Sequence, residues 1–170
     1  MTMGISPDLL QFLQAHTQLI EFSKFDSLFT RAENQLSMGE YLEFIQLLKD
    51  SDIDPIPYMT YIPDNYYQGE SMTKITIPPN IKEIRMGAFE DCLWLKEVHL
   101  PGTVEDIHMD VFKADNGLKI VTFDGSRDQW EMVLVSKIYN DPLFKCGVTC
   151  NDGKVEYVKE PGKDWEIVEW

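Results

Sequence analysis

The sequence predicts a mixed α/β (α+β) fold, in which N-terminal helices cap a short solenoid built on a small parallel sheet. Two observations lead to this prediction. Helical patterns run through the first 50 residues, and an apolar skeleton then repeats every 23 residues from about residue 71. A constant skeleton with variable residues between its fixed points is typical of a solenoid, because each turn buries its apolar side only against its neighbours.

Composition limits the classes of protein that this chain can belong to. Its 170 residues suffice for one domain with a real core, or for a small domain with an appendage. The 29 acidic and 15 basic residues give a formal charge of −14, which repels nucleic acid and also serves simply to keep a protein dispersed. We therefore expect no direct nucleic-acid binding. If electrostatic attraction brings a partner to this acidic chain, we expect that partner to be a protein with a basic surface.

Location and cofactors are also constrained by the sequence. The start, "MTMGISPDLLQFLQ", lacks the features of a secretory signal, and no apolar run approaches the length of a membrane span. Three cysteines, Cys92, Cys146 and Cys150, form no CxxC pair and are too few for a zinc site. We expect a cytoplasmic protein with no metal, no cofactor and no membrane contact.

The first element in chain order is a helical cap over residues 1–50. The segment "SPDLLQFLQ" opens with Ser6 as a cap and Pro7 at the first helical position, and "SMGEYLEFIQLLKD" opens with a capping box from Ser37 to Glu40. A third, weaker helix is expected between them. The exposed end of a solenoid needs covering, so these helices are expected to cover it.

The second element is the repeat, over residues 71–135. Each unit carries the pattern L-x-x-I-x-I, which indicates a short strand, and Pro78 and Pro101 end the strands. A helical or irregular return is expected on the opposite side. The period aligns Ile75 with Val98 and Val121, Ile84 with Ile107 and Trp130, and Phe89 with Phe112 and Val135.

Two further segments flank the repeat. Residues 51–70 form a connector that contains three prolines and four tyrosines. We expect it to be an ordered crossover whose aromatic side chains pack on the helices, and the alternative is an exposed aromatic patch that binds a partner. Residues 136–170 end in the acidic, aromatic run "DWEIVEW", with Trp165 and Trp170. This tail suits an added edge strand and a docking peptide equally well.

The segment "ITIPPNIKEIRMGAFEDCLWLKEVHLPGTVEDI" resembles the BspA-type leucine-rich repeats, and the order of helices, "YIPDNYY" and repeats is similar to certain tailed-phage proteins of this class. "LKIVTFDGSRDQWEMVL" followed by "VTCNDG" resembles the ending of that family, which implies a leucine-rich-repeat solenoid closed by a C-terminal β-hairpin. The chain departs from the family where Asp115 replaces the cysteine and Asp110 the glycine. We expect the return loop there to be looser or bent outward.

No catalytic motif is present, so we expect a protein that is not an enzyme. The leading hypothesis is a phage-encoded, protein-binding module that inhibits a host defence or nucleic-acid enzyme. The alternative is a structural subunit or decoration of a virion or other assembly, which would form homo-oligomers. A third and weaker hypothesis is a hydrolase whose catalytic residues have an unfamiliar arrangement.

Three regions are candidates for the partner-binding site. The first is the acidic set on the return loops, and the second is the outward row of the strands. The third is the tail. Their residues are Glu105, Asp106, Asp110 and Asp115; Thr76, His99 and Thr122; and Trp165 and Trp170.

Overall fold

We analysed a computed structural model of the chain, which describes residues 2–3, 11 and 36–168. They fall into two compact units, Met1–Met59 and Thr60–Trp170, which are treated separately. No helix of the described ranges is long and apolar enough to span a membrane.

The first unit contains the predicted helix that follows Ser37. It appears as α3, Met38–Asp50, with Phe44, Ile45 and Leu48 buried. The helix ends in a Schellman arrangement, because Asp52 adopts a φ of 58° and the Ile53 amide donates to the Leu48 carbonyl. The remaining elements are an antiparallel pair, β1 (Thr2–Met3) with β2 (Leu36–Ser37), and the 3-10 turn η2 (Ile56–Tyr58). The other two predicted helices lie outside the described residues.

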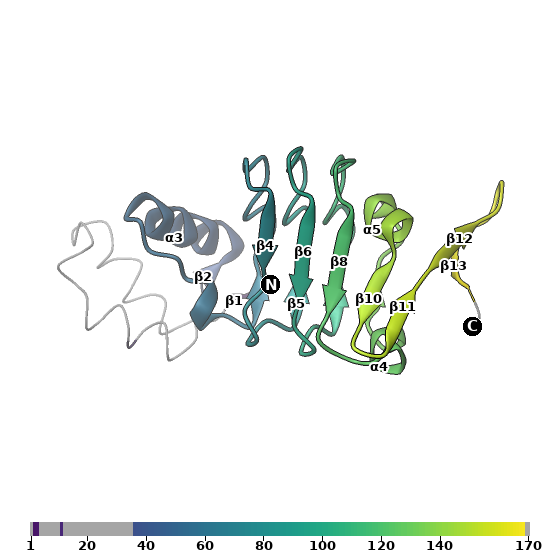
Figure 1. Cartoon of the computed structure of the whole chain (residues 1–170). Helices are drawn as coiled ribbons and strands as arrows, with labels where there is room; N and C mark the ends of the chain where they lie inside the picture. Colours follow the sequence, from purple (N-terminus) through teal and green to yellow (C-terminus); the bar gives the residue numbers. More distant parts are fainter. Residues whose placement is uncertain (1, 4–10, 12–35, 169–170) are drawn as a thin grey trace. The chain divides into compact units, whose positions relative to one another are not determined.

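The second unit is built on a five-stranded sheet in the order β11-β10-β8-β6-β4 (Figure 1). Its strands are β4 (Lys74–Thr76), β6 (Glu97–Leu100), β8 (Ile120–Phe123), β10 (Val148–Cys150) and β11 (Gly153–Val155). The first four run parallel, and Ile75, Val98 and Val121 lie in register. The 23-residue period is therefore confirmed up to Phe123.

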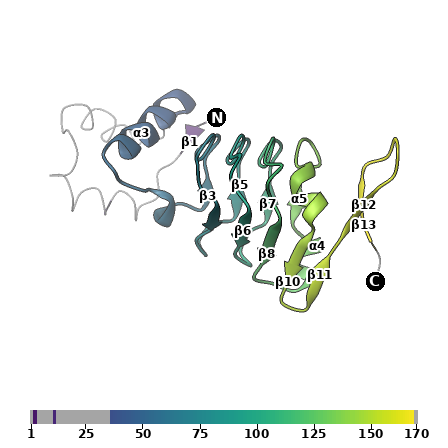
Figure 2. The same cartoon turned by 45° about the horizontal axis from the view of Figure 1, so that its top comes forward.

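A second parallel sheet lies behind the first, with the order β3-β5-β7-β9 (Figure 2). Its two-residue strands are β3 (Tyr61–Ile62), β5 (Glu83–Ile84), β7 (Asp106–Ile107) and β9 (Leu134–Val135). The segments expected to form a helical or irregular return, residues 85–92 and 108–115, are irregular turns, and the strands of this sheet directly precede them at positions where no strand was predicted. The sheet begins at Tyr61, so the second half of the expected connector already belongs to the stack.

The third turn departs from the 23-residue period. A short helix, α4 (Arg127–Glu131), intervenes after β8, capped by Ser126 and Gln129 in a capping box. Ile107 pairs with Val135, 28 positions on, and not with Trp130 as the period predicted. Trp130 is instead buried against Phe123, with 5.2 Å between ring centroids.

The return loops stack as regularly as the strands. Tyr67 stacks on Phe89 at 5.3 Å, and Phe89 stacks on Phe112 at 5.8 Å. The Asn140 side chain ends this column: its Oδ1 accepts from the Phe112 amide at 3.0 Å, and its Nδ2 donates to the His108 carbonyl at 2.7 Å. Asn140 thus provides the hydrogen bonds that a further turn would supply.

Two columns of residues with positive φ shape these loops. One contains Asn65, Gly87, Asp110 and Tyr139, and the other contains Gly69, Asp91 and Ala114. Glycine is favoured at position 87, because its φ is 65° and a Cβ there would displace the Asn65 side chain, whose Oδ1 would lie 2.1 Å away. Asp110 adopts the same conformation, with a φ of 61°. The Asp115 amide donates to the Phe112 carbonyl just as the Cys92 amide donates to the Phe89 carbonyl one turn earlier. The loop "KADNGL" therefore keeps the common path, and the expectation that it bends outward was wrong.

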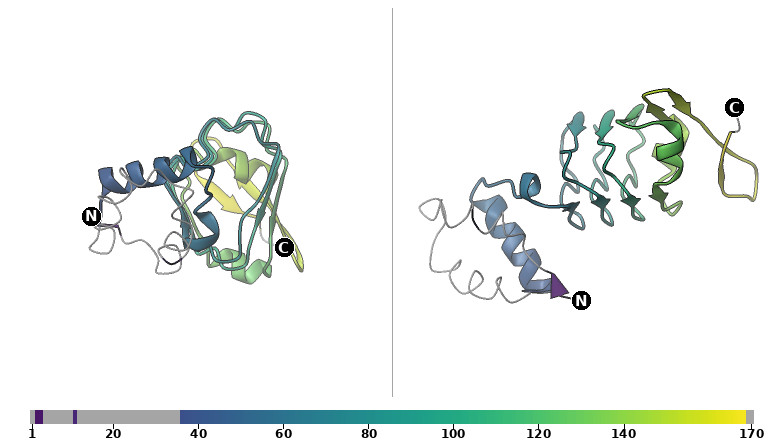
Figure 3. Two further views of the ribbon diagram at one scale, coloured as in Figure 1. Left: turned by 90° about the vertical axis from the view of Figure 1, so that its left-hand side faces the viewer. Right: turned by 90° about the horizontal axis from the view of Figure 1, so that it is seen from below.

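The C-terminal region begins with α5 (Asp141–Cys146) and the predicted hairpin, in which β10 pairs with β11. A second hairpin, β12 (Tyr157–Lys159) with β13 (Trp165–Ile167), lies beyond β11 (Figure 3). Trp165 stacks on Phe144 at 5.8 Å, and its Nε1 donates to Asp141 at 2.9 Å. Residues 165–167 of the tail are therefore a strand in this structure. Trp170 lies outside the described residues.

Candidate functional site

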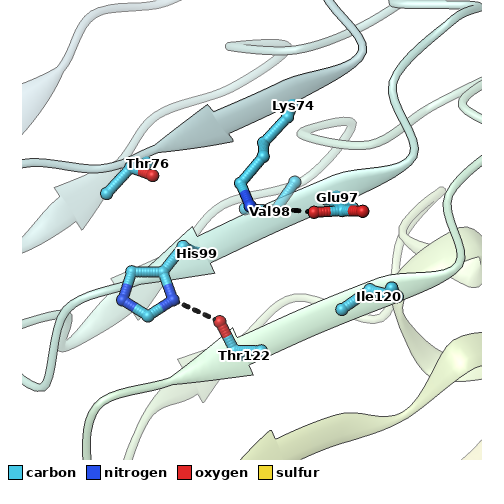
Figure 4. A pocket seen from close by; sticks show the side chains of 7 residues that line it. All are labelled: Lys74, Thr76, Glu97, Val98, His99, Ile120 and Thr122. Carbon is cyan, nitrogen blue, oxygen red and sulfur yellow. Dashed lines mark hydrogen bonds and ion pairs between the residues drawn. The ribbon is translucent and has the colours of Figure 1, made fainter.

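The outward side chains of β4, β6 and β8 form a continuous surface, which we call the open face. It consists of Lys74, Thr76, Glu97, His99, Ile120 and Thr122. Alternation along each strand sends Ile75, Val98 and Val121 inward and these residues outward. They line a shallow depression of about 360 Å³ (Figure 4). The predicted row Thr76, His99 and Thr122 is thus brought together in register.

Interactions between neighbouring strands hold the polar side chains of the open face. Lys74 pairs with Glu97 at 3.0 Å. His99 Nδ1 contacts the Thr122 hydroxyl, and its Nε2 lies 3.1 Å from Asp124 Oδ2. A neutral imidazole satisfies both contacts if Nε2 carries the proton, accepting from Thr122 and donating to Asp124. These contacts fix side chains that would otherwise lose rotamer freedom on binding a partner.

The order of hydroxyl, imidazole and carboxylate in Thr122, His99 and Asp124 is also found in hydrolases, so its chemistry needs examination. Catalysis of acyl transfer requires free N–H donors that stabilise an oxyanion. Here β8 lies between β6 and β10, so its backbone is engaged in sheet pairing on both sides. On the described structure these three side chains form a hydrogen-bonded group on and beside the open face.

Sequence reasoning missed Asp124. Its position is 23 residues after Pro101, where a residue that ends the strand was expected. The alignment could have shown a carboxylate in place of that proline, next to the outward row.

Most of the predicted acidic residues of the return side lie close to a basic side chain. Glu105 lies 2.8 Å from Lys82, and the pKa of Lys82 is raised, first by its hydrogen bond with Glu105. Asp110 lies 4.0 Å from Lys113, and Asp106 lies 3.5 Å from His108. The predicted acidic set therefore does not form a surface of unopposed negative charge.

Asp115, the fourth acidic candidate, is completely buried. Neither carboxyl oxygen has a hydrogen-bond partner in the described part of the chain. Burial raises the pKa of Asp115 to about 8, although the Cys92 backbone acts in the opposite direction. The side chain cannot contact a partner unless the loop opens.

Of the two tail candidates, only Trp165 is described. It is half-buried, and beside it lies a second depression of about 340 Å³, lined mainly by Trp130, Val135, Phe144 and Tyr157. The Tyr157 hydroxyl accepts from Trp130 Nε1 at 2.6 Å, and burial raises the pKa of Tyr157 to about 12. Trp165 therefore contributes to packing of the C-terminal hairpin.

Within the described ranges, no group of three or more His, Cys, Asp and Glu side chains is placed to hold a metal ion. All three cysteines are free thiols. The arrangement offers a surface for recognition.

Comparison with known proteins gave two findings. Residues 57–133 match the family described as BspA type leucine rich repeat region, in six copies. A leucine rich cell surface protein from Faecalibacterium prausnitzii A2-165, known from a crystal structure, is 28% identical with a TM-score of 0.44; the match covers 46% of this chain and 21% of that one. A search of curated proteins found no match.

Proposed function

Because residues 57–133 match BspA-type leucine-rich repeats, we propose that this chain is a non-enzymatic, protein-binding module whose binding surface is the open face. The observation that carries the proposal is the register of the outward residues. The inward row forms the core, whereas Thr76, His99 and Thr122 contribute little to it and are free to match a partner. Their mutual contacts also lower the entropy cost of binding.

Several finer hypotheses extend this proposal. We infer from the repeat that the stacked turns form a solenoid, and from the exposed end of such a stack that the N-terminal helices cap it. The similarity to tailed-phage proteins and the net charge of −14 support a phage-encoded inhibitor of a host enzyme, acting in the cytoplasm. The alternative of a virion subunit rests on the same similarity. These hypotheses stay predictions.

The proposal is tested by blocking the open face. Thr76→Tyr combined with Thr122→Tyr adds bulk while retaining residues that suit strands. Met86→Tyr combined with Met109→Tyr is the matched control, because both methionines are exposed outside this face. Proteins captured from a lysate by the wild-type chain are quantified by mass spectrometry for both variants.

A genuine partner should be lost from the blocked variant and retained by the control. The two variants must first show the same circular dichroism and melting temperature as the wild type. A partner retained by the blocked variant, or lost equally from both, would show that the binding surface lies elsewhere.

A further inference from the structure

Two exposed lysines lie side by side at the N-terminal edge of the open face. Lys96 and Lys119 directly precede β6 and β8, and the Lys119 amide donates to the Lys96 carbonyl at 3.0 Å. Their backbones are therefore one strand spacing apart, about 4.8 Å. Neither forms an ion pair with any described residue, whereas Lys74, Lys82 and Lys113 each pair with a glutamate.

The carboxylate next to Lys96 already has a partner, because Glu97 pairs with Lys74 at 3.0 Å. Asp124, at the other end of β8, lies 3.1 Å from His99. In the second sheet, Glu83 pairs with Arg85 and Asp106 lies 3.5 Å from His108, and Glu105, which directly precedes β7, pairs with Lys82. The edge of the open face thus carries two unopposed positive charges in a protein whose net charge is −14.

Exposed apolar side chains lie on both sides of the lysine pair. Leu93 and Trp94, 62% and 64% exposed, are in the loop that leads to Lys96, and Ile120, 47% exposed, follows Lys119. By the strand register, Ser71 and Gly117 hold the position of Trp94 in the neighbouring turns. A single large aromatic side chain between small neighbours is typical of a residue that anchors a protein partner.

We propose that the edge of the open face formed by Lys96, Lys119 and the neighbouring loop binds an acidic segment of a partner protein. Carboxylates of that segment contact Lys96 and Lys119, and an apolar side chain packs against Leu93 and Trp94. This inference rests on the proposed function and names the partner that the site selects. It replaces the basic partner expected from the net charge, because local charge at the contact surface outweighs distant charges that salt screens.

Two labelled peptides test the proposal on the full chain. One is Glu-Leu-Glu-Phe-Glu, and the other is Lys-Leu-Lys-Phe-Lys. Binding is measured by fluorescence anisotropy at several salt concentrations. The acidic peptide should bind more tightly and weaken as salt rises, although net charge alone favours the basic peptide.

Charge reversal locates the binding site. Lys96→Glu combined with Lys119→Glu should weaken binding of the acidic peptide by about tenfold or more. The matched control is Lys137→Glu combined with Lys145→Glu, which changes net charge equally at exposed lysines outside the five-stranded sheet. It should leave affinity within about twofold. Trp94→Ala should weaken binding by about tenfold, whereas Met132→Ala, at an apolar residue that is even more exposed, should not.

The failures of the two proposals are distinguishable. If the tyrosine block at Thr76 and Thr122 abolishes partner binding but reversal at Lys96 and Lys119 does not, the acidic segment is refuted and the open face remains the binding surface. Tighter binding of the basic peptide, or equal weakening by both charge reversals, also refutes it. Tighter binding of a single-stranded DNA oligonucleotide or a heparin fragment would assign the lysines to another polyanion and overturn the proposal.

Discussion

Asp115 lies directly beside Cys92, one turn further along the stack, and both side chains are completely buried. The Cys92 thiol donates to the Tyr67 carbonyl at 3.0 Å, whereas the Asp115 carboxyl group finds no hydrogen bond among the described residues. The same loop conformation therefore holds a satisfied thiol in one turn and an unsatisfied carboxyl group in the next.

Asp115→Cys should stabilise the protein. The substitution removes a buried polar group without partners and supplies the side chain found one turn earlier, so the free energy of unfolding should rise by about 1–3 kcal/mol. Urea denaturation followed by tryptophan fluorescence measures the second unit alone, since all four tryptophans lie in it. Asp164→Cys, at an exposed position outside the repeats and not among the residues with positive φ, is the control and should change stability little. Equal effects of the two substitutions would contradict the prediction.

The stability gain should also depend on pH. The pKa of Asp115 is raised to about 8 by burial, from the usual 3.8. Between these values the folded chain retains a proton that the unfolded chain has released, so stability falls as pH rises through this window. The advantage of Asp115→Cys should therefore be small near pH 4, increase towards pH 8 and then level off. Denaturation curves at pH 4.5, 6 and 7.5 measure it, and a constant difference would refute the burial of a protonated Asp115.

Cys92 should resist thiol reagents in the folded protein. Burial, and secondarily the nearby Asp115, raise its pKa to about 11, so little thiolate exists at neutral pH. Labelling with a maleimide at pH 7.5, read by mass spectrometry of the peptides, should reach Cys92 only after unfolding in guanidinium. Cys146, partly exposed but also with a pKa raised to about 11 by burial, is the internal comparison. Labelling of Cys92 as fast as in denaturant would show that the return loops open readily.

Ala114→Gly should stabilise the loop that holds Asp115. Ala114 has a φ of 67°, a conformation that costs an alanine roughly 1–2 kcal/mol and costs a glycine little. Part of this difference is offset because glycine has more conformational freedom in the unfolded chain. The free energy of unfolding should therefore rise by about 0.5–1 kcal/mol. Ala88→Gly is the control: Ala88 is buried and is not among the residues with positive φ, so that change should destabilise. Thermal melting of both variants provides the test, and destabilisation by Ala114→Gly would contradict the strain argument.

The sequence predicted the front strands well because their apolar positions alternate over four or more residues. Val98 and Val121 could be aligned by period alone, and the structure pairs them. The second sheet escaped prediction because each strand, such as Glu83–Ile84, has only two residues and no alternation to detect. The third turn was misaligned because α4 inserts extra residues, and its buried Trp130 happens to lie at a position where the 23-residue period required an apolar residue.

The candidate site shows a similar division. The outward row of Thr76, His99 and Thr122 followed from alternation, but the pairing of the acidic residues was overlooked. The same period that aligns the core also aligns Lys82 with Glu105 and Glu90 with Lys113, so these ion pairs were available from the sequence. The burial of Asp115 could not be predicted from the sequence, because its loop differs from the neighbouring loops in composition and matches them only in the path of its backbone.

The detour through α4 also indicates where this architecture tolerates a change of chain length. The helix lengthens the third turn, yet β8 and β9 remain in register with β6 and β7. The corresponding passage one turn earlier leaves no such space, since a Cβ at Gly102 would meet the Asp124 carbonyl oxygen at 2.6 Å. An insertion between Ser126 and Val133 should therefore cost little more free energy than the entropy of closing a longer loop. An insertion at Gly102 would instead separate the neighbouring turns.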